Sequence, residues 1–112
     1  MKKKQGGYVY LLGDSGKENL FKIGVTKGTI EARIKKLQTG NSGEIYICNY
    51  FQTEYPFFIE KQLHFKYHNK KVLNEWFELN NDDILNFTKE CEKIEEMIFI
   101  MKDNPFFPKK LN

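Results

Sequence analysis

Residues 7–26, GYVYLLGDSGKENLFKIGVT, decide the fold because they contain two apolar runs separated by turn-forming residues. The runs at 7–13 and 20–26 are rich in β-branched, aromatic and aliphatic side chains, a composition that favours strands. The residues between them are polar or glycine and have the chemistry of a turn. We therefore expect an antiparallel hairpin with a loop of about six residues at 14–19.

The segment after the hairpin has the pattern of an amphipathic helix. Ile30, Ile34 and Leu37 recur at helical spacing and would form one apolar face. Thr29 is suited to the N-cap, and Gly40 is placed to end the helix in a left-handed conformation. We therefore expect one helix between these two residues.

The rest of the chain continues to alternate between apolar runs and turn signals. A strand is expected at 44–53, a helix at 55–71, a short extended segment or turn at 72–80, and a helix at 82–104. Pro56 suits the first position of its helix, and Asn80 or Asn81 would cap the last helix. This order predicts an α+β fold, in which a three-stranded antiparallel sheet is flanked by helices.

The chain is long enough for one domain with its own core. Of its 112 residues, 40% are hydrophobic, and at this length roughly two-thirds of the unfolded surface is buried on folding. No apolar run approaches the roughly 20 residues of a membrane helix, and the basic start MKKK is followed by QGG instead of an apolar signal sequence. We expect a single domain over residues 1–112, a cytoplasmic location and no membrane contact.

Arg33 is more informative about function than the overall charge. The formal net charge of +3 is compatible with a nucleic-acid partner but does not indicate one. Arg33 is the only arginine among 18 basic residues, so the other seventeen are lysines. Its planar guanidinium can form two fixed hydrogen bonds to a phosphate or a carboxylate. The alternative interpretation is that Arg33 is an ordinary solvated charge on the helix, paired with nearby acidic residues.

Other polar or glycine residues stand out within the two expected strands of the hairpin. Tyr8 and Tyr10 are two apart and so share one face, as do Lys22 and Gly24 on the second strand. A lysine is unexpected in the apolar run LFKIGV, although a solvent-facing position would also account for it. Gly24 fits either an ordinary bulge or a close approach to the backbone.

The second helix carries a carboxylate among apolar side chains. Glu60 lies in the run FFIEKQL, and His64 and His68 follow at intervals of four residues. The spacing alone would suit zinc, but no cysteine or further ligand cluster supports such a site. Glu60 therefore either lies on the solvent-exposed face of the helix or is held among apolar side chains for a function.

Four of these features occur in an order that resembles the GIY-YIG nuclease superfamily. They are YVY at 8–10, KIG at 22–24, Arg33 in the following helix and Glu60 on the next one. Three longer stretches are similar to the compact branch common in phages and bacteria: RIKKLQTGN at 33–41, EKQLHFKY at 60–67 and EWFEL at 75–79. The resemblance covers residues 7–79, which we expect to be a GIY-YIG-like catalytic core, and leaves 80–112 as a C-terminal helix and tail.

The resemblance implies a metal-dependent endonuclease that hydrolyses phosphodiester bonds in DNA. Mg²⁺ or Mn²⁺ would be the cofactor, with Glu60 as its protein ligand, because magnesium accepts one carboxylate and several waters. Arg33 would grip the phosphate and Tyr10 would transfer a proton, with Lys22 assisting Tyr10 or positioning the nucleophile itself. The catalytic candidates are Tyr8, Tyr10, Lys22, Arg33 and Glu60, and the further candidates are Gly24, His64 and Asn74.

The sequence also departs from the family pattern. Tyr8 stands at the first Gly of the family name, Lys22 at the first Tyr of YIG, and Leu37 where several relatives have a histidine. Two alternatives therefore stay open: a nucleic-acid-binding module with the same fold but no turnover, and a structural or interaction protein. We see no appended recognition domain, so sequence specificity would need a homodimer or a partner protein. These residues do not distinguish DNA from RNA.

Overall fold

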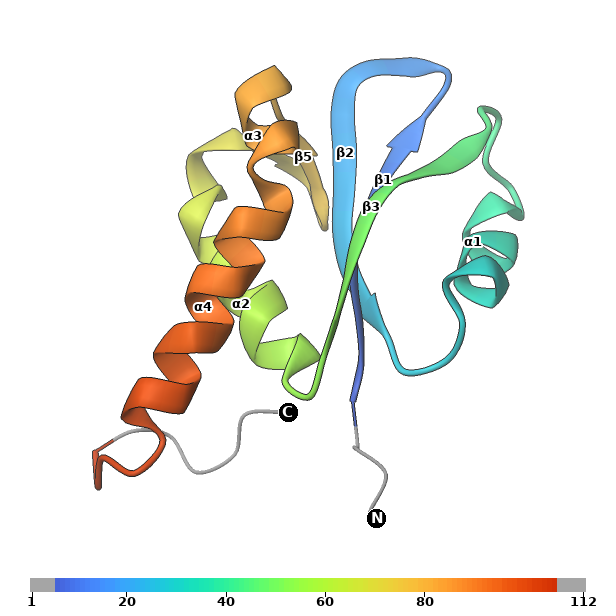
Figure 1. The fold of residues 1–112 in the computed structure, drawn as a ribbon. Helices are drawn as coiled ribbons and strands as arrows, with labels where there is room; N and C mark the ends of the chain where they lie inside the picture. Colours follow the sequence, from blue (N-terminus) through green and yellow to red (C-terminus); the bar gives the residue numbers. More distant parts are fainter. Residues whose placement is uncertain (1–5, 107–112) are drawn as a thin grey trace.

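The first hairpin forms the centre of the sheet (Figure 1). In the computed structural model, which describes residues 6–106, strand β1 (Gly7–Asp14) pairs antiparallel with β2 (Lys17–Thr26). Only residues 15–16 separate the strands, so the longer loop that the sequence predicted is wrong. The polar residues 17–19 belong to β2, because they lie at its exposed end, where polar side chains remain in water.

The sheet has five strands instead of the three expected. The strand expected at 44–53 is present as β3 (Ile45–Thr53), and it pairs with β1 on the side away from β2. The segment expected to be a short extended piece or turn forms a second hairpin of β4 (Lys71–Leu73) and β5 (Trp76–Glu78). The strand order is β3-β1-β2-β5-β4. The two added strands were missed because such short strands show no alternation.

Helix α1 (Ile30–Gln38) lies where its capping residues predicted. The hydroxyl of Thr29 accepts a hydrogen bond from the backbone N–H of Ala32 at 3.1 Å, and Gly40 has the left-handed φ of 79°. Ile30 is buried, so the predicted apolar face packs on the sheet.

Helix α2 (Pro56–Lys66) begins at the proline, as predicted from its fixed φ. It is shorter than the helix expected at 55–71 because the chain tightens into a 3₁₀ turn, η1 (His68–Lys70), after Tyr67. The backbone N–H of Tyr67 donates to the carbonyl of Leu63 at 3.0 Å, and the Tyr67 side chain is buried. The 3₁₀ turn leads directly into β4.

The long helix expected at 82–104 is divided into α3 (Asn81–Leu85) and α4 (Phe87–Met101). The break at Asn86 places Phe87, which is only 2% exposed, in the core of the protein. The expected tail continues beyond the described residues at its last six positions, 107–112. No helix in the described part of the chain is long and apolar enough to cross a membrane.

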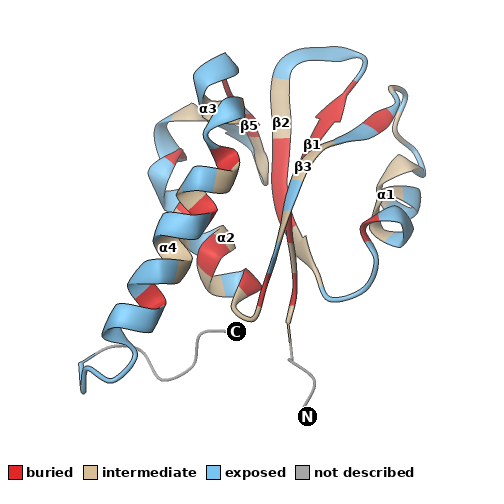
Figure 2. Ribbon diagram, in the orientation of Figure 1, coloured by how far each residue is buried: buried red, intermediate tan, exposed pale blue. Residues whose placement is uncertain are grey.

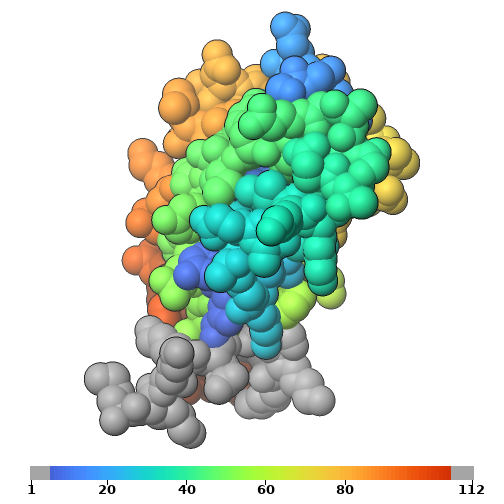
Figure 3. Space-filling view, turned by 90° about the vertical axis from the view of Figure 1, so that its right-hand side faces the viewer, coloured from blue at the N-terminus to red at the C-terminus, as the bar shows by residue number. Residues whose placement is uncertain are grey.

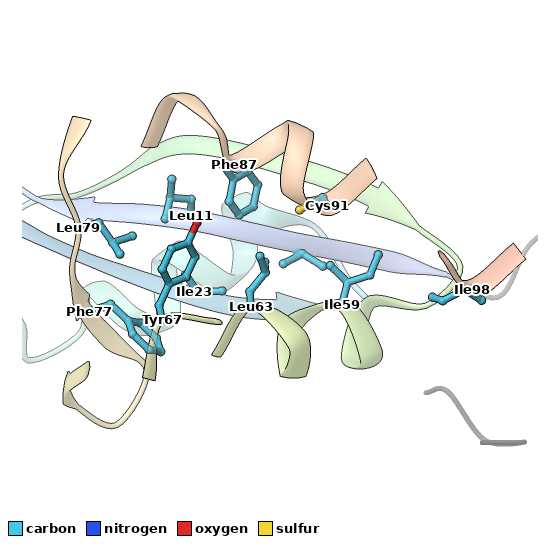
Figure 4. Close-up of a cluster of buried hydrophobic side chains, with 11 residues drawn as sticks. Leu11, Ile23, Ile59, Leu63, Tyr67, Phe77, Leu79, Phe87, Cys91 and Ile98 are labelled. Atoms are coloured by element: carbon cyan, nitrogen blue, oxygen red, sulfur yellow. The ribbon is translucent and has the colours of Figure 1, made fainter. Parts of the chain in front are cut away.

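Helices cover both faces of the sheet: α2 and α4 lie on one face and α1 on the other (Figure 1). In the space-filling view, α1 and β3 fill much of the visible surface (Figure 3). Strand β1 is buried along nearly its whole length (Figure 2), and its side chains alternate between two cores. The larger core lies beneath α2 and α4 (Figure 4) and includes Val9, Leu11, Ile23, Ile59, Leu63, Phe87, Cys91 and Ile98. The smaller core consists of Tyr10, Leu12, Ile30 and Ile45.

The buried carboxylate of Asp14 links three parts of the fold. It accepts hydrogen bonds from the backbone N–H of Gly16 at 2.8 Å and from the side-chain amide of Asn41 at 3.0 Å. The side chain of Gln38 accepts a further bond from the N–H of Ile45 at 2.8 Å. These bonds fasten the β1–β2 turn, the end of α1 and the start of β3, so the QTGN stretch has a structural role.

Replacing Asp14 with alanine should lower the free energy of unfolding by about 1–3 kcal/mol, because the backbone N–H of Gly16 and the side-chain amide of Asn41 lose their buried acceptor. The bonds from Asn41 and Gly16 lower the pKa of the Asp14 carboxyl. A lowered folded-state pKa gives stability that is present above the ordinary aspartate value of about 3.9 and is lost as the pH falls through the folded value. The difference in free energy of unfolding between wild type and variant, measured in urea, should therefore be larger at neutral pH than at strongly acidic pH.

The matched control for this experiment is Glu18→Ala, which removes an exposed carboxylate from the same hairpin. We expect the control to change the free energy of unfolding by less than about 0.5 kcal/mol. An equal loss of stability in the two variants would contradict the linking role of Asp14.

Candidate active site

Tyr10 lies at the centre of the candidate site and is fully buried. It stands opposite Gly24 in the β1–β2 register, and its ring crosses the position that a side chain at Gly24 would occupy. A Cβ atom built on Gly24 would lie 2.5 Å from the Tyr10 hydroxyl oxygen, far inside van der Waals contact. The close approach that the sequence offered as one explanation for this glycine is therefore present, and the approaching group is the tyrosine ring.

Arg33 of α1 meets Tyr10 on the same face of the sheet. Its Nε donates a hydrogen bond to the Tyr10 hydroxyl oxygen at 3.2 Å. Because Nε lies on one edge of the planar guanidinium, this bond sets the orientation of the group. The bond does not use the two terminal nitrogens, which can therefore bind a ligand in two-pronged fashion.

The surroundings of Tyr10 favour its neutral form. Burial raises the pKa of Tyr10, the hydrogen bond and charge of Arg33 lower it, and the charges of Glu75 and Glu60 raise it again, with a net increase. Tyr10 is therefore a neutral phenol at neutral pH. The same hydrogen bond raises the pKa of Arg33, which secures the positive charge. Since Tyr10 accepts the bond from Arg33, its own hydroxyl proton is not used in that bond.

Lys22 is only 9% exposed, so the solvent-facing position considered for it is wrong. Its Nζ lies 3.1 Å from Oε1 of Glu75 and 5.6 Å from the centre of the Trp76 ring. Trp76 is the cross-strand partner of Lys22 on β5. Lys22 shares a face of β2 with Gly24, and its ammonium therefore lies on the side of the sheet that holds Tyr10.

Glu75 is a residue of the site that the sequence did not single out. It immediately precedes β5, and the β4–β5 hairpin brings it to Lys22. The stretch EWFEL contains no spacing that points to this contact, because only the pairing of Trp76 with Lys22 places Glu75 beside the second strand. The charge of Glu75 also acts on three other candidates, which are Tyr10, Arg33 and Glu60.

Glu60 and His64 reach the site from α2, on the opposite face of the sheet. Strand β5 begins opposite Lys22, so the part of β2 after this residue pairs with β1 on one side and with no other described strand on its other side. At this edge, Nε2 of His64 donates to the carbonyl oxygen of Ile23 at 2.9 Å and lies 3.8 Å from Oε2 of Glu60. His64 thus anchors α2 to β2 and places Glu60 near the groups of the other face.

Glu60 is suited to hold a weakly ligated cation. Burial raises the pKa of Glu60, the charges of His64 and Lys22 lower it, and the charge of Glu75 raises it. A cation would offset the cost of burying this carboxylate, and Mg²⁺ accepts one protein oxygen ligand together with several waters. Within residues 6–106, no three His, Cys, Asp or Glu side chains are grouped so that they could hold a metal. These residues therefore do not form the closed ligand set of a structural zinc site.

Two candidates lie apart from these contacts. The half-buried ring of Tyr8 meets the ring of Tyr50 edge to face, with 5.8 Å between the ring centres. Asn74 is exposed in the turn between β4 and β5, with a left-handed φ of 54° that asparagine tolerates. Its position is explained by the turn, and it makes no hydrogen bond to the other candidates in the described part of the chain. The residues that the structure brings together are Tyr10, Lys22, Gly24, Arg33, Glu60, His64 and Glu75.

Residues 7–92 match the family model described as the T5orf172 domain. The matched segment runs from β1 into α4 and contains every candidate residue, from Tyr8 to Glu75. Comparison with curated proteins and with solved structures gave no match.

Replacing Gly24 with alanine should lower the free energy of unfolding by about 1–3 kcal/mol, because the added methyl group would displace the Tyr10 ring from a packed position. Urea unfolding measures this loss. Gly28→Ala is the matched control, since a Cβ at Gly28 would meet only the Thr26 hydroxyl oxygen, at 3.8 Å. If both variants lost the same stability, the contact with Tyr10 would not be what requires a glycine at this position.

Replacing Glu60 with glutamine should raise the free energy of unfolding near neutral pH by an amount on the order of 0.5 kcal/mol. The reason is that the raised pKa of Glu60 reports a carboxylate whose charge is disfavoured in the folded state. Below the ordinary glutamate pKa of about 4.3, Glu60 is protonated in both the folded and the unfolded state, so the variant gains no stability. Above the raised pKa that Glu60 has in the folded state, the variant has its full gain in stability. Thermal unfolding in the presence of EDTA, at neutral and acidic pH, measures the difference; a variant less stable than wild type at neutral pH would contradict it.

Proposed function

The chain belongs to the T5orf172 domain family, and from this premise we propose that it is a metal-dependent endonuclease of the GIY-YIG type, which hydrolyses phosphodiester bonds in DNA. The T5orf172 domain is a phage-associated domain in a nuclease-related set, which is consistent with a role on nucleic acid. The observation that carries the proposal is the hydrogen bond from Arg33 to Tyr10. Lys22 and Glu60 supply further charge to the same edge of the sheet.

Arg33 would bind the phosphate that is attacked. Its Nε is held by Tyr10, so its terminal nitrogens would face the substrate as a fixed pair of donors. Two such donors strengthen their hold as negative charge develops on the phosphoryl oxygens. This role needs the planar fork and explains why the site uses the one arginine of a lysine-rich chain.

Tyr10 and Lys22 would handle the proton and the remaining charge. The raised pKa of Tyr10 disfavours a tyrosinate, so Tyr10 would act by orienting Arg33 and donating its hydroxyl proton, not by removing a proton from water unaided. Lys22 holds a positive charge near the phosphate position assigned to Arg33 and would orient the attacking water or a phosphate oxygen. Tyr8 shares the face of Tyr10 and would line the substrate path.

Glu60 would hold Mg²⁺ or Mn²⁺, with His64 keeping the helix in place. When bound, the cation supplies positive charge that offsets the charge developing on the phosphate and on the leaving oxygen. Glu60 is suited to this role because burial raises its pKa despite the charges of His64 and Lys22, so that a bound cation would stabilise its charged form.

Cleavage of supercoiled plasmid with Mg²⁺ or Mn²⁺ tests the proposal. We expect wild type to produce nicked circles before linear DNA, because one chain contributes one site. Glu60→Gln and Arg33→Lys should each lower the cleavage rate by about 100-fold or more. The first variant lacks the metal ligand, and the second lacks the planar guanidinium that binds the phosphate through two hydrogen bonds. Glu96→Gln, an exposed carboxylate on α4, is the matched control and should cut like wild type.

Equal cutting by wild type and Glu60→Gln would overturn the assignment of the metal carboxylate. If neither the wild type nor any variant cut DNA, a gel shift at low salt would separate the alternatives. A shift weakened by Arg33→Lys would favour a nucleic-acid-binding module without turnover, because phosphate binding is strongest at low salt. No shift at all would favour a structural or interaction protein.

A further inference from the structure

We propose that Glu75 is a positioning residue, which holds the ammonium group of Lys22 at the active site. The proposal deepens the nuclease function proposed above and rests on it for the catalytic role of Lys22. Its starting point is the ion pair of 3.1 Å between Lys22 Nζ and Glu75 Oε1. The side chain of Lys22 is only 11% exposed, whereas that of Glu75 is 39% exposed.

The backbone fixes Glu75 in place independently of its side chain. The N–H of Ile23 donates to the carbonyl oxygen of Glu75 at 3.1 Å, and the next residue, Trp76, pairs with Lys22 in the β2–β5 register. The turn at Asn74, with its left-handed φ of 54°, brings the chain back at this point. The carboxylate of Glu75 therefore starts from an anchored backbone beside the lysine.

Lys22 needs such a partner more than an arginine would. A lysine ammonium is a point charge on a flexible four-carbon stem, so its position is not set by its own geometry. A buried ammonium without a partner would also be costly to the fold. The Trp76 ring, 5.6 Å from Nζ, and the Glu75 carboxylate confine the group from two directions.

A purely structural role for Glu75, such as holding the β4–β5 hairpin, makes different predictions. The charge of Glu75 also reaches Tyr10, Arg33 and Glu60, but a residue that acts mainly through Lys22 should have little further effect once Lys22 is gone. A residue that only stabilises the hairpin should lower stability or binding whether Lys22 is present or not. The two roles are therefore separated by a double-mutant cycle.

The cycle compares single-turnover plasmid cleavage by wild type, Glu75→Gln, Lys22→Met and the double variant. We expect Glu75→Gln to lower the cleavage rate by about 10- to 100-fold with little change in DNA affinity, because a misplaced catalytic group affects the chemical step. The double variant should cut no more slowly than Lys22→Met alone. Glu78→Gln, which changes an exposed carboxylate on β5 three residues away, is the matched control and should cut like wild type.

Multiplicative effects in the cycle, or unchanged cleavage by Glu75→Gln, would overturn the proposal. Urea unfolding of each variant shows that the compared chains are folded.

A second readout does not depend on cleavage. In a proton–nitrogen spectrum of the lysine ammonium groups, Lys22 should give a slowly exchanging signal, identified by its absence from Lys22→Met. Glu75→Gln should weaken or remove this signal, and Glu78→Gln should leave it unchanged. If the signal persisted unaltered in Glu75→Gln, the positioning role would be wrong. If the signal responded as expected but wild type did not cut DNA, the ion pair would stand and the nuclease function would fail.

Discussion

The packing of the Tyr10 ring across Gly24 is the contact on which the candidate site depends. It requires a residue without a side chain on β2, and it requires this register of the two strands. A shift by one residue would send the tyrosine to the other face of the sheet. In the observed register the phenol reaches Arg33, and Lys22 lies on the same face two residues from the glycine. The hydrogen bonds of Asp14 hold the turn of this hairpin and so help to keep the register.

The site gathers four charged groups around one neutral phenol. Arg33 and Lys22 are positive, Glu60 and Glu75 are negative, and all four lie at or near the buried part of the sheet. Charges in such a place are tolerated when they are paired, and an unpaired one is costly. The partly buried carboxylate of Glu60 therefore lowers the stability of the fold, which is typical of residues retained for function.

The long elements and most of the site could be predicted from the sequence, and the short ones could not. Strands β1 and β2 and helix α1 have apolar patterns long enough to show their period, so Tyr10 and Arg33 could be assigned to faces. Strands β4 and β5 are too short to show an alternation of apolar and polar residues. Without their hairpin, neither the contact of Glu75 nor the burial of Lys22 could be foreseen. The break at Asn86 was hidden because apolar residues keep helical spacing across it.

The candidate site is assembled from both halves of the chain and from both faces of the sheet. The β1–β2–α1 segment contributes Tyr10, Lys22 and Arg33, whereas Glu60 and Glu75 come from α2 and from the start of β5. During synthesis, a ribosome would release the first set while the second is still unmade. The growing chain would carry these two basic side chains without Glu60 and Glu75, and the complete set would form only when α2 docks on β2 and β5 pairs with it.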